Sequence, residues 1–246
     1  MLLYHGVGER AGADDPFRLF VPPSRLRRQL SMLLAHGWTP LRLDQYLRGD
    51  TPPRSVLVTF DDGYRGMFRE GLPVLRELGV PATVFLLPGL LGATSRWMKE
   101  MSGEPLVDEE EVQDMARAGL DLGCHGWDHT CLAGADADTL ARNTTRAARA
   151  LADITGRRPR AFAYPWGAHD ARARRAVAEA GFDVAFSTHG AAGRYAIPRV
   201  DINALDTVVS FRLKCLPGFP VMRRVSGRVP GLRPALNRLT GRVARG

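Results

Sequence analysis

The sequence predicts an α/β fold in which about seven parallel strands form a distorted (β/α) barrel. Short apolar segments of strand length alternate with longer segments of helical periodicity along residues 1–205. This alternation, at this spacing, is typical of strands that helices connect in parallel. The most unusual polar residues follow directly after the expected strands, which is where chemistry collects in parallel barrels.

Strands are expected where buried, β-branched or aromatic residues cluster. Residues Ser55–Phe60 read SVLVTF, and residues Ala82–Leu87 read ATVFLL. The other expected strands are Leu2–His5, Leu120–His125, Ala161–Tyr164, Phe182–Ser187 and Ala196–Val200.

The helices expected between these strands carry recognisable ends. Ser24 is a candidate N-cap of a helix that Gly37 ends. Asp108 and Glu111 have the spacing of a capping box at the start of another helix. The expected helices are 24–35, Arg65–Leu78, 109–118, Ala137–Ile154 and Asp170–Ala180.

The composition is that of a globular protein with a buried core, because 45% of the 246 residues are hydrophobic. No run of 18 apolar residues occurs, so no membrane-spanning helix is expected. The first residues, MLLYHGVGER, lack the basic start and apolar stretch of a signal peptide, so we expect a cytoplasmic protein. Three cysteines are too few, and odd in number, for a disulfide scaffold.

Positive charge is concentrated at the C-terminal end of the chain. Residues 207–246 contain nine Arg and Lys residues and no Asp or Glu, whereas the rest of the chain is close to neutral. We therefore expect a catalytic domain at residues 1–205 and a basic tail at residues 206–246.

The tail has the pattern of an amphipathic helix, which would contact an anionic membrane surface peripherally. A tail or last helix packed on the domain is the alternative. Nothing besides the charge favours nucleic-acid binding, so no nucleic-acid partner is expected. The apolar residues spaced along one helical face are Leu232, Leu236, Leu239 and Val243.

Two adjacent carboxylates, Asp61 and Asp62, follow the strand SVLVTF and precede Gly63. Two such charges are unfavourable without a cation near them. Side chains alternate along a strand, so the two carboxylates should diverge. One can then bind a metal ion while the other faces a water molecule. Taken alone, Asp-Asp-Gly also fits an ordinary turn.

Two histidines, His125 and His129, follow the strand DLGC. A turn in this segment would bring both imidazoles to one side, and neutral imidazole is a common metal ligand. Two surface histidines without a shared function are the alternative for this spacing.

Several aromatic residues near strand ends are candidates for the walls of a substrate groove. Tyr164, Pro165 and Trp166 belong to a YPWG turn that closes the strand AFAY, and Tyr64 follows the two carboxylates. Trp97 lies in the loop 88–107, and loops of this length are often functional. An ordinary aromatic-rich turn is the alternative for YPWG.

In combination and in this order, these segments resemble the polysaccharide deacetylase family (carbohydrate esterase family 4, with a NodB-like domain). The segments that carry the resemblance are TFDDGY at 59–64, HGWDH at 125–129 and RAFAYPWG at 160–167. The resemblance covers about residues 1–205. It implies a NodB-like barrel and the hydrolysis of N-acyl groups on the amino sugars of glycans.

The resemblance also implies roles for individual residues. Asp61 corresponds to the catalytic base, and Arg160 to the residue that orients it. Trp166 would direct its backbone N–H at the oxyanion. The residues that correspond to metal ligands are Asp62, His125 and His129.

The chain departs from the family pattern at three places. A second Arg that often precedes Pro165 is missing, and Gly126 stands where Ser or Thr is common. No late Leu-x-x-His is present, but Leu2-Leu3-Tyr4-His5 has that pattern at the N-terminus. We therefore predict that His5 is the general acid, and the alternative is that His5 merely ends its strand. Arg199 and Asp201 end the last strand, from which either can reach the mouth of the site.

A divalent ion with open coordination positions polarises an amide carbonyl and lowers the pKa of water that it binds. Two His and one Asp suit Zn²⁺ best, and Co²⁺, Ni²⁺ or Fe²⁺ would also be accepted. These ligands predict a metal-dependent hydrolase, and the resemblance implies that it removes N-acetyl groups from amino sugars of a poly- or oligosaccharide. The alternatives are a hydrolase of non-sugar amides on the same fold and a glycan-binding module without catalysis.

Overall fold

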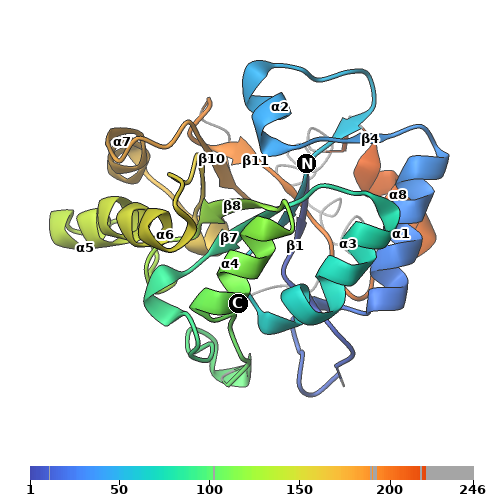
Figure 1. Cartoon of the computed structure of the whole chain (residues 1–246), viewed down its shortest axis with the longest axis horizontal. Coiled ribbons are helices and arrows are strands. Elements are labelled where there is room, and N and C mark those ends of the chain that lie inside the picture. Colours follow the sequence, from blue (N-terminus) through green and yellow to red (C-terminus); the bar gives the residue numbers. More distant parts are fainter. Residues whose placement is uncertain (11, 102, 189, 191–192, 217, 220–246) are drawn as a thin grey trace, which may run out of the picture.

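The computed structural model describes the whole chain except residues 11, 102, 189, 191–192, 217 and 220–246. Its centre is an eight-stranded sheet in the order β11-β10-β9-β8-β7-β6-β1-β12, in which every strand pair is parallel (Figure 1). The strands are β1 (Leu2–Tyr4), β6 (Val58–Phe60), β7 (Thr83–Leu86), β8 (Asp121–Cys124), β9 (Ala161–Ala163), β10 (Val184–Ser187), β11 (Ile197–Pro198) and β12 (Val200–Asp201).

The two edges of this sheet almost meet, which makes it a barrel. Strands β11 and β12 lie at opposite edges, yet only Arg199 separates them in sequence. Residues two apart in a chain are at most about 7 Å apart between Cα atoms, so the edges are held together at this point. We call this place, residues 197–201, the seam. The predicted α/β barrel is confirmed, but the single strand expected at Ala196–Val200 is two strands on opposite sides of the seam.

Helices surround the barrel, as the alternating pattern predicts (Figure 1). Two of the expected helices contain a π-helical segment, η1 (Met67–Gly71) before α3 and η4 (Arg142–Arg146) between α5 and α6. Such segments often occur at functional sites, and both follow segments that supply site residues. The helices expected from the sequence are α1 (Pro23–Ala35), α3 (Leu72–Leu78), α4 (Glu109–Arg117), α5 (Ala137–Ala141) with α6 (Ala147–Thr155), and α7 (Ala171–Glu179).

Short elements that the sequence pattern did not reveal lie in the connections. They are too short to show periodicity, and long-range pairing defines them. They are β2 (Gly6–Val7) with β3 (Phe20–Val21), the strand β4 (Thr39–Pro40), the helix α2 (Leu43–Arg48), and the 3₁₀ turns η2 (Pro88–Leu90) and η3 (Lys99–Met101). Strand β4 pairs with β5 (Ser55–Val56), which is the first part of the expected strand Ser55–Phe60 and lies in a separate sheet from β6. The predicted YPWG turn is the 3₁₀ turn η5 (Pro165–Gly167).

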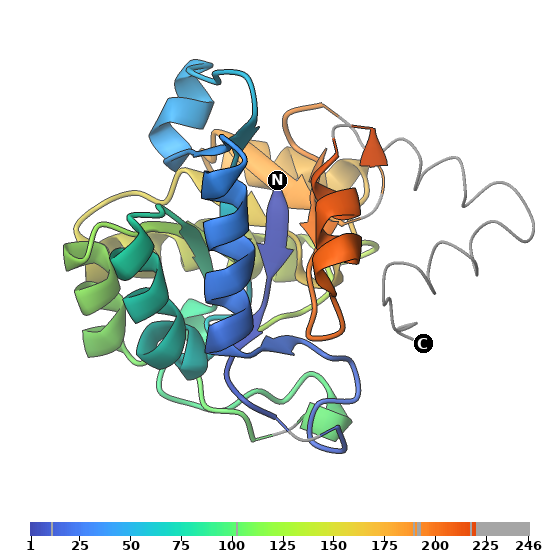
Figure 2. The ribbon, with the colours of Figure 1, turned by 90° about the vertical axis from the view of Figure 1, so that its right-hand side faces the viewer.

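The folded body continues beyond residue 205, where the basic tail was expected to begin. Residues Val208–Cys215 form the helix α8, and Phe211 on this helix is fully buried. Figure 2 shows α1 and α8 on either side of β1. The predicted amphipathic face at Leu232–Val243 lies outside the described residues. Among the described residues, no helix is long and apolar enough to cross a membrane.

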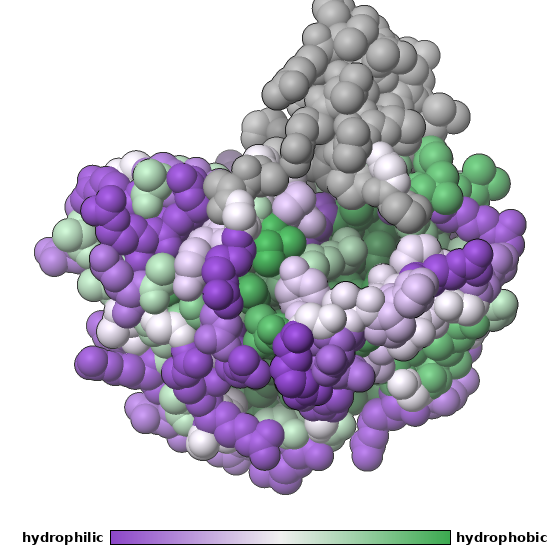
Figure 3. All heavy atoms as spheres, turned by 90° about the horizontal axis from the view of Figure 1, so that it is seen from above, coloured by the Kyte–Doolittle hydropathy of each residue, from purple (hydrophilic) through white to green (hydrophobic). Residues whose placement is uncertain are grey.

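The end of the barrel at which the strands begin is largely apolar. A cavity of about 770 Å³ opens there between α1 and α8, with Leu33, Trp38 and Val56 among the residues that line it. Figure 3 views this end and shows apolar residues in a hollow, surrounded by hydrophilic ones. The polar residues singled out in the sequence lie at the other end, where the strands finish.

Candidate active site

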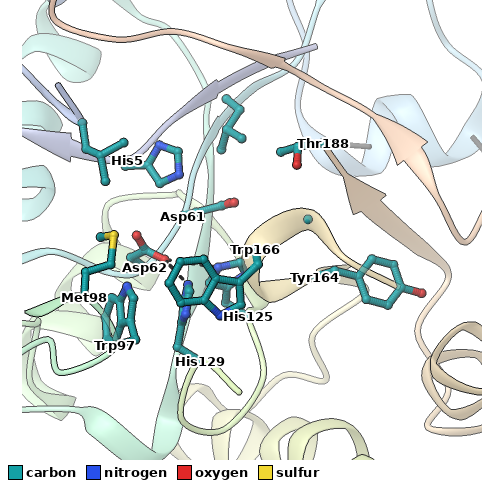
Figure 4. Close-up of a pocket in the computed structure, with 13 residues that line it drawn as sticks. His5, Asp61, Asp62, Trp97, Met98, His125, His129, Tyr164, Trp166 and Thr188 are labelled. Atoms are coloured by element: carbon teal, nitrogen blue, oxygen red, sulfur yellow. Dashed lines mark ion pairs between the residues drawn. The ribbon is translucent and has the colours of Figure 1, made fainter. Parts of the chain in front are cut away.

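The predicted site residues meet at the carboxyl end of the barrel. Asp61 and Asp62 follow β6, His125 and His129 follow β8, and His5 follows β1. All five side chains are nearly fully buried and line one pocket (Figure 4). Neighbouring parallel strands finish at the same edge, which is why residues up to 124 positions apart in the sequence become neighbours.

Strand register explains which side chains enter the pocket. In the β1–β6 pair, Leu3 lies opposite Thr59, and both are buried. Side chains on a strand alternate between its two faces. His5 and Asp61, two residues further along, therefore point into the barrel on the same side as Leu3 and Thr59. The intervening Tyr4 packs outside the barrel.

Three side chains converge in a geometry that fits a divalent metal ion. Oδ1 of Asp62 lies 3.2 Å from Nε2 of His125 and 3.2 Å from Nε2 of His129. The three potential ligand atoms all lie within 4.8 Å of one another. Oδ1 of Asp62 is buried and makes no well-formed hydrogen bond within the described part of the chain. Three such ligand atoms, buried and this close together, fit a single divalent metal ion.

A second contact fixes the orientation of one imidazole. Nδ1 of His125 lies 2.8 Å from the backbone carbonyl oxygen of Ala163 on β9. This contact places the proton of a neutral His125 on Nδ1, so that Nε2 keeps its lone pair for the metal ion. Strand β9 thus supports a ligand that β8 supplies.

The charges in the pocket shift the pKa values of these groups in different directions. Burial raises the pKa of Asp62, but the two facing imidazoles lower it by more, so its pKa lies well below the usual value. Burial lowers the pKa of His125, but Asp61 and Asp62 raise it by more. For His129, burial outweighs Asp62, and its pKa is lowered. One histidine therefore holds a proton more tightly than the other in the protein without metal.

Three site residues adopt a left-handed backbone conformation that is unfavourable for residues other than glycine. The φ angles are +72° at Asp62, +64° at His129 and +62° at Trp166. Each such residue costs on the order of 1–3 kcal/mol and persists only where the surroundings impose it. The backbone strain is therefore concentrated at two metal-ligand candidates and at the turn that faces them.

Asn143, in the π-helical segment η4, holds the loop that carries both histidines. Its Oδ1 accepts a 2.8 Å hydrogen bond from the backbone N–H of Trp127. A Cβ atom on Gly126 would lie only 2.9 Å from the same oxygen, and Gly126 has a φ of +91°. The Ser or Thr common in the family would not fit here, and Asn143 supplies the polar contact in this loop.

A buried ion pair fixes Asp61. The guanidinium of Arg199 donates two hydrogen bonds of 2.7 Å, one to each carboxylate oxygen of Asp61, and a third of 3.0 Å to Oγ1 of Thr59. The Arg199 side chain is completely buried and lies over the rings of Phe85 and Phe186. Burial raises the pKa of Asp61, but Arg199 and nearby imidazoles lower it by more, so Asp61 is ionised at neutral pH.

Arg160 is not the residue that orients Asp61, contrary to what the resemblance implied. Its side chain is 46% exposed and pairs with Asp183 at 2.6 Å, away from the pocket. Arg160 precedes β9 at the end where the strand begins, whereas Asp61 lies where strands finish. Arg199 in the seam provides the contact to Asp61 instead.

Two tryptophans form walls of the pocket. The ring of Trp97 stacks on His129 with a centroid distance of 4.4 Å and an interplanar angle of 14°. Trp166 meets the same imidazole edge-on at 4.9 Å and is 39% exposed. Figure 4 shows the two tryptophans beside the imidazole of His129. Trp97 and Trp166 therefore flank His129 beside the other candidate metal ligands.

The other three predicted substrate contacts are less direct. Tyr64 is fully buried between Phe20 and Trp97, so it supports Trp97 from behind. Tyr164 borders the pocket, but its hydroxyl donates to the backbone oxygen of Tyr195, and Figure 4 shows its ring pointing away. Pro165 is buried and is not among the described residues that line the pocket.

His5 faces a carboxylate across the seam. Its Nδ1 lies 3.8 Å from Oδ1 of Asp201, at the end of β12. Asp201 pairs with Leu3 in the sheet register, so its side chain points to the same face of the sheet as that of His5. The segment IPRVD at the end of the last expected strand was the only sequence signal for Arg199 and Asp201.

Pocket residues that the sequence did not single out include two apolar side chains and one hydroxyl side chain from distant loops. Leu19 precedes β3, Met98 follows Trp97, and Thr188 follows β10. They have no motif of their own, and only the fold brings them to the pocket.

The fold and the site together fit a class of enzyme, the metal-dependent hydrolases built on a parallel (β/α) barrel. The family model "Polysaccharide deacetylase" matches residues 48–185, more than half of the chain. The chain belongs to the polysaccharide deacetylase family and is a hydrolase of that type.

Individual relatives agree with this assignment. A poly-beta-1,6-N-acetyl-D-glucosamine N-deacetylase of Staphylococcus aureus (strain MSSA476) is 24% identical over 217 residues, which cover 81% of this chain and 72% of that protein. The structure of IcaB from Ammonifex degensii is 26% identical, with a TM-score of 0.72, over 86% of this chain and 92% of that one. The Streptococcus pyogenes deacetylase PplD, in complex with acetate, shares the fold with a TM-score of 0.76 at 19% identity, over 88% of this chain and 97% of that one.

The pH dependence of metal binding follows from the two histidines. Because the pKa of His125 is raised and that of His129 is lowered, an ion that binds at a pH between these two pKa values displaces the proton of His125 alone. We predict that the apparent Kd weakens about tenfold for each pH unit below the pKa of His125. Competition with a chelator across pH 6–8 measures this slope. If the pH dependence of the Kd showed that two protons, or none, are released on metal binding, the release of a single proton from His125 would be contradicted.

Removing the guanidinium from Arg199 should destabilise the barrel, because the buried charge of Asp61 loses its partner. We predict that Arg199→Gln lowers the free energy of unfolding by about 3–5 kcal/mol at pH 8. The pKa of Asp61 rises in this variant, so the loss should shrink as the pH falls through it. The matched control, Arg160→Gln, should cost only about 0–1 kcal/mol because that pair is exposed. Urea unfolding of metal-free protein measures both values, and equal losses would refute the account.

Proposed function

We propose that this protein removes N-acetyl groups from amino-sugar units of a poly- or oligosaccharide in glycan or exopolysaccharide metabolism. The observation that carries the proposal is the buried cluster of Asp62, His125 and His129 beside the ionised Asp61, beneath two tryptophans. The name of the S. aureus relative, an N-deacetylase of a polymer of N-acetylglucosamine, supports the choice of substrate class.

The residues divide the work of amide hydrolysis among them. Asp61, held ionised by Arg199, accepts the proton of the attacking water. The backbone N–H of Trp166 donates to the oxyanion as it forms. His5, facing Asp201, donates a proton to the departing amine, which stays on the sugar while acetate leaves. In these assignments the base and the acid directly follow two adjacent strands, β6 and β1.

The Asp62, His125 and His129 set would hold one divalent ion. When bound, that ion would polarise the acyl carbonyl and make water more acidic. The ligand types favour Zn²⁺, and Co²⁺, Ni²⁺ or Fe²⁺ also suit two imidazoles and one carboxylate.

Two alternatives share the same fold. A hydrolase of non-sugar amides would use the same residues, and a panel of N-acetylated saccharides and simple amides distinguishes it by acetate release. A glycan-binding module without catalysis would bind the saccharide and release no acetate. The intact set of Asp61 and three metal ligands favours an enzyme.

The role of Asp61 gives a direct prediction. Asp61→Asn keeps the shape of the side chain but cannot accept the proton of water, so acetate release from N-acetylglucosamine oligomers should fall by about 10²–10⁴-fold. The metal content should stay at the wild-type level, because Asp61 is not a ligand. Asp62→Asn is the contrasting variant, which should lose the metal ion. An Asp61→Asn protein with near-normal turnover would refute the assignment.

We also propose that the protein contacts an anionic membrane surface peripherally, which would bring it near a lipid-linked glycan. Residues 220–246 carry seven arginines and no acidic residue. Three apolar side chains are exposed in the loop before α8 and in its first turn, Leu205 by 45%, Val208 by 37% and Val209 by 77%. Such a combination of basic and apolar groups favours anionic lipid surfaces. The cytoplasmic location stays a prediction.

Sedimentation with liposomes tests this contact. The full chain should sediment with vesicles that contain anionic phosphatidylglycerol and less with phosphatidylcholine alone. A chain that ends at Phe219 keeps α8 and should lose most of this binding, because about 1 kcal/mol is contributed by each basic residue at an anionic surface. Equal binding by the two chains would exclude the role of residues 220–246.

A further inference from the structure

A buried ion pair links α8 to the end of β12. Nζ of Lys214 lies 2.6 Å from Oδ2 of Asp206 and donates a 2.9 Å hydrogen bond to the backbone oxygen of Asp201. Both side chains of the pair are almost completely buried. Asp206 also accepts hydrogen bonds from the backbone N–H of Asn203 and from the hydroxyl of Ser210. The loop 201–206 is therefore held around one carboxylate and one ammonium group.

This ion pair holds the residue that faces His5. On one side, β1 fixes the chain at Asp201, because Ile202 donates its backbone N–H to the oxygen of Leu3 at 2.8 Å. On the other side, Lys214 holds the carbonyl of Asp201 itself. The carboxylate of Asp201, 3.8 Å from Nδ1 of His5, thus depends on α8 for its place.

The choice of residue type at position 214 is unusual for this chain. Only Lys99 and Lys214 among the 34 basic residues are lysines, and all others are arginines. A compact ammonium fits between one carbonyl and one carboxylate, whereas a guanidinium is planar and needs a wider space. Burying such a pair is costly, and removing one partner is costlier still. On the exposed surface an arginine would serve equally well, so the lysine at position 214 is explained by its buried contacts.

We propose that Lys214, paired with Asp206, is a positioning residue that holds Asp201 against His5 and so keeps His5 placed to protonate the leaving amine. The inference rests on the proposed function, because it acts through His5. It adds α8, which lies beyond the residues that match the family model, to the parts of the chain that determine turnover.

Leaving-group chemistry separates this role from simple support of the fold. An amine must be protonated to leave, whereas 4-nitrophenolate leaves without a proton. We therefore compare acetate release from N-acetylglucosamine oligomers with hydrolysis of 4-nitrophenyl acetate, on protein loaded with Zn²⁺. Lys214→Met should lower kcat for the amide by about tenfold to 10²-fold, the size expected for a misplaced catalytic group. The ester rate, the KM values and the metal content should stay within about threefold of wild type.

Further variants keep the test decisive. Lys214→Met leaves Asp206 as an unpaired buried charge, and this variant could fail to fold for that reason alone. The double variant Asp206→Asn/Lys214→Met buries no charge at this place. It should show the same loss of kcat for the amide. Arg212→Met removes an exposed cation from the same helix and should behave as wild type. His5→Ala should show a loss confined to the amide that is at least as large.

The outcomes are distinguishable. Equal losses on amide and ester, or no loss on either, in the Lys214 variants would overturn the positioning role while His5→Ala still discriminates. If His5→Ala lowered the rates of amide and ester hydrolysis equally, the role of His5 as general acid would be overturned, and with it the positioning role of Lys214. A wild-type protein that hydrolyses the ester but no N-acetylated saccharide would contradict the proposed function, and the inference would fall with it.

Discussion

The buried pair of Arg199 and Asp61 is the interaction on which both the barrel and the site depend. It lies inside the barrel at the seam, where the two edges of the sheet are separated by a single residue. Each charge would be strongly unfavourable in this position without the other. Arg199 is that single residue, so the segment that brings the two edges of the sheet together also carries the guanidinium that binds Asp61. A change that opens the seam should therefore affect the ionised carboxylate first.

The site lowers the stability of the folded protein, and contacts from neighbouring segments hold it in place. Left-handed backbone at Asp62, His129 and Trp166, together with buried charges, opposes folding at one end of the barrel. The π-helical segment η4 supports the histidine loop through Asn143, and the aromatic rings of Tyr64 and Trp97 support it from the side. The apolar clusters between the barrel and its helices provide the compensating stability.

The sequence predicted those features that local pattern determines. Strand ends followed by Asp61-Asp62 and by His125 and His129 predicted the location of the candidate metal ligands, because parallel strands finish together. The prediction that Arg160 orients Asp61 was wrong. The order of residues in the sequence cannot show that the segment 196–200 divides into two strands at the seam and brings Arg199 inside the barrel. The helix α8 was also missed, because its apolar and polar residues do not separate into faces, and Phe211 is buried through packing in the same apolar cluster as Leu2 and Val200.

The central claim is that Asp62, His125 and His129 hold the one divalent ion on which hydrolysis depends. The most direct measurement is a titration of chelator-treated, metal-free protein with Zn²⁺ while acetate release from N-acetylglucosamine oligomers is followed. The account predicts no activity without metal and a linear rise that saturates at one ion per chain. Full activity in the metal-free protein, or saturation only at two ions per chain, would contradict it.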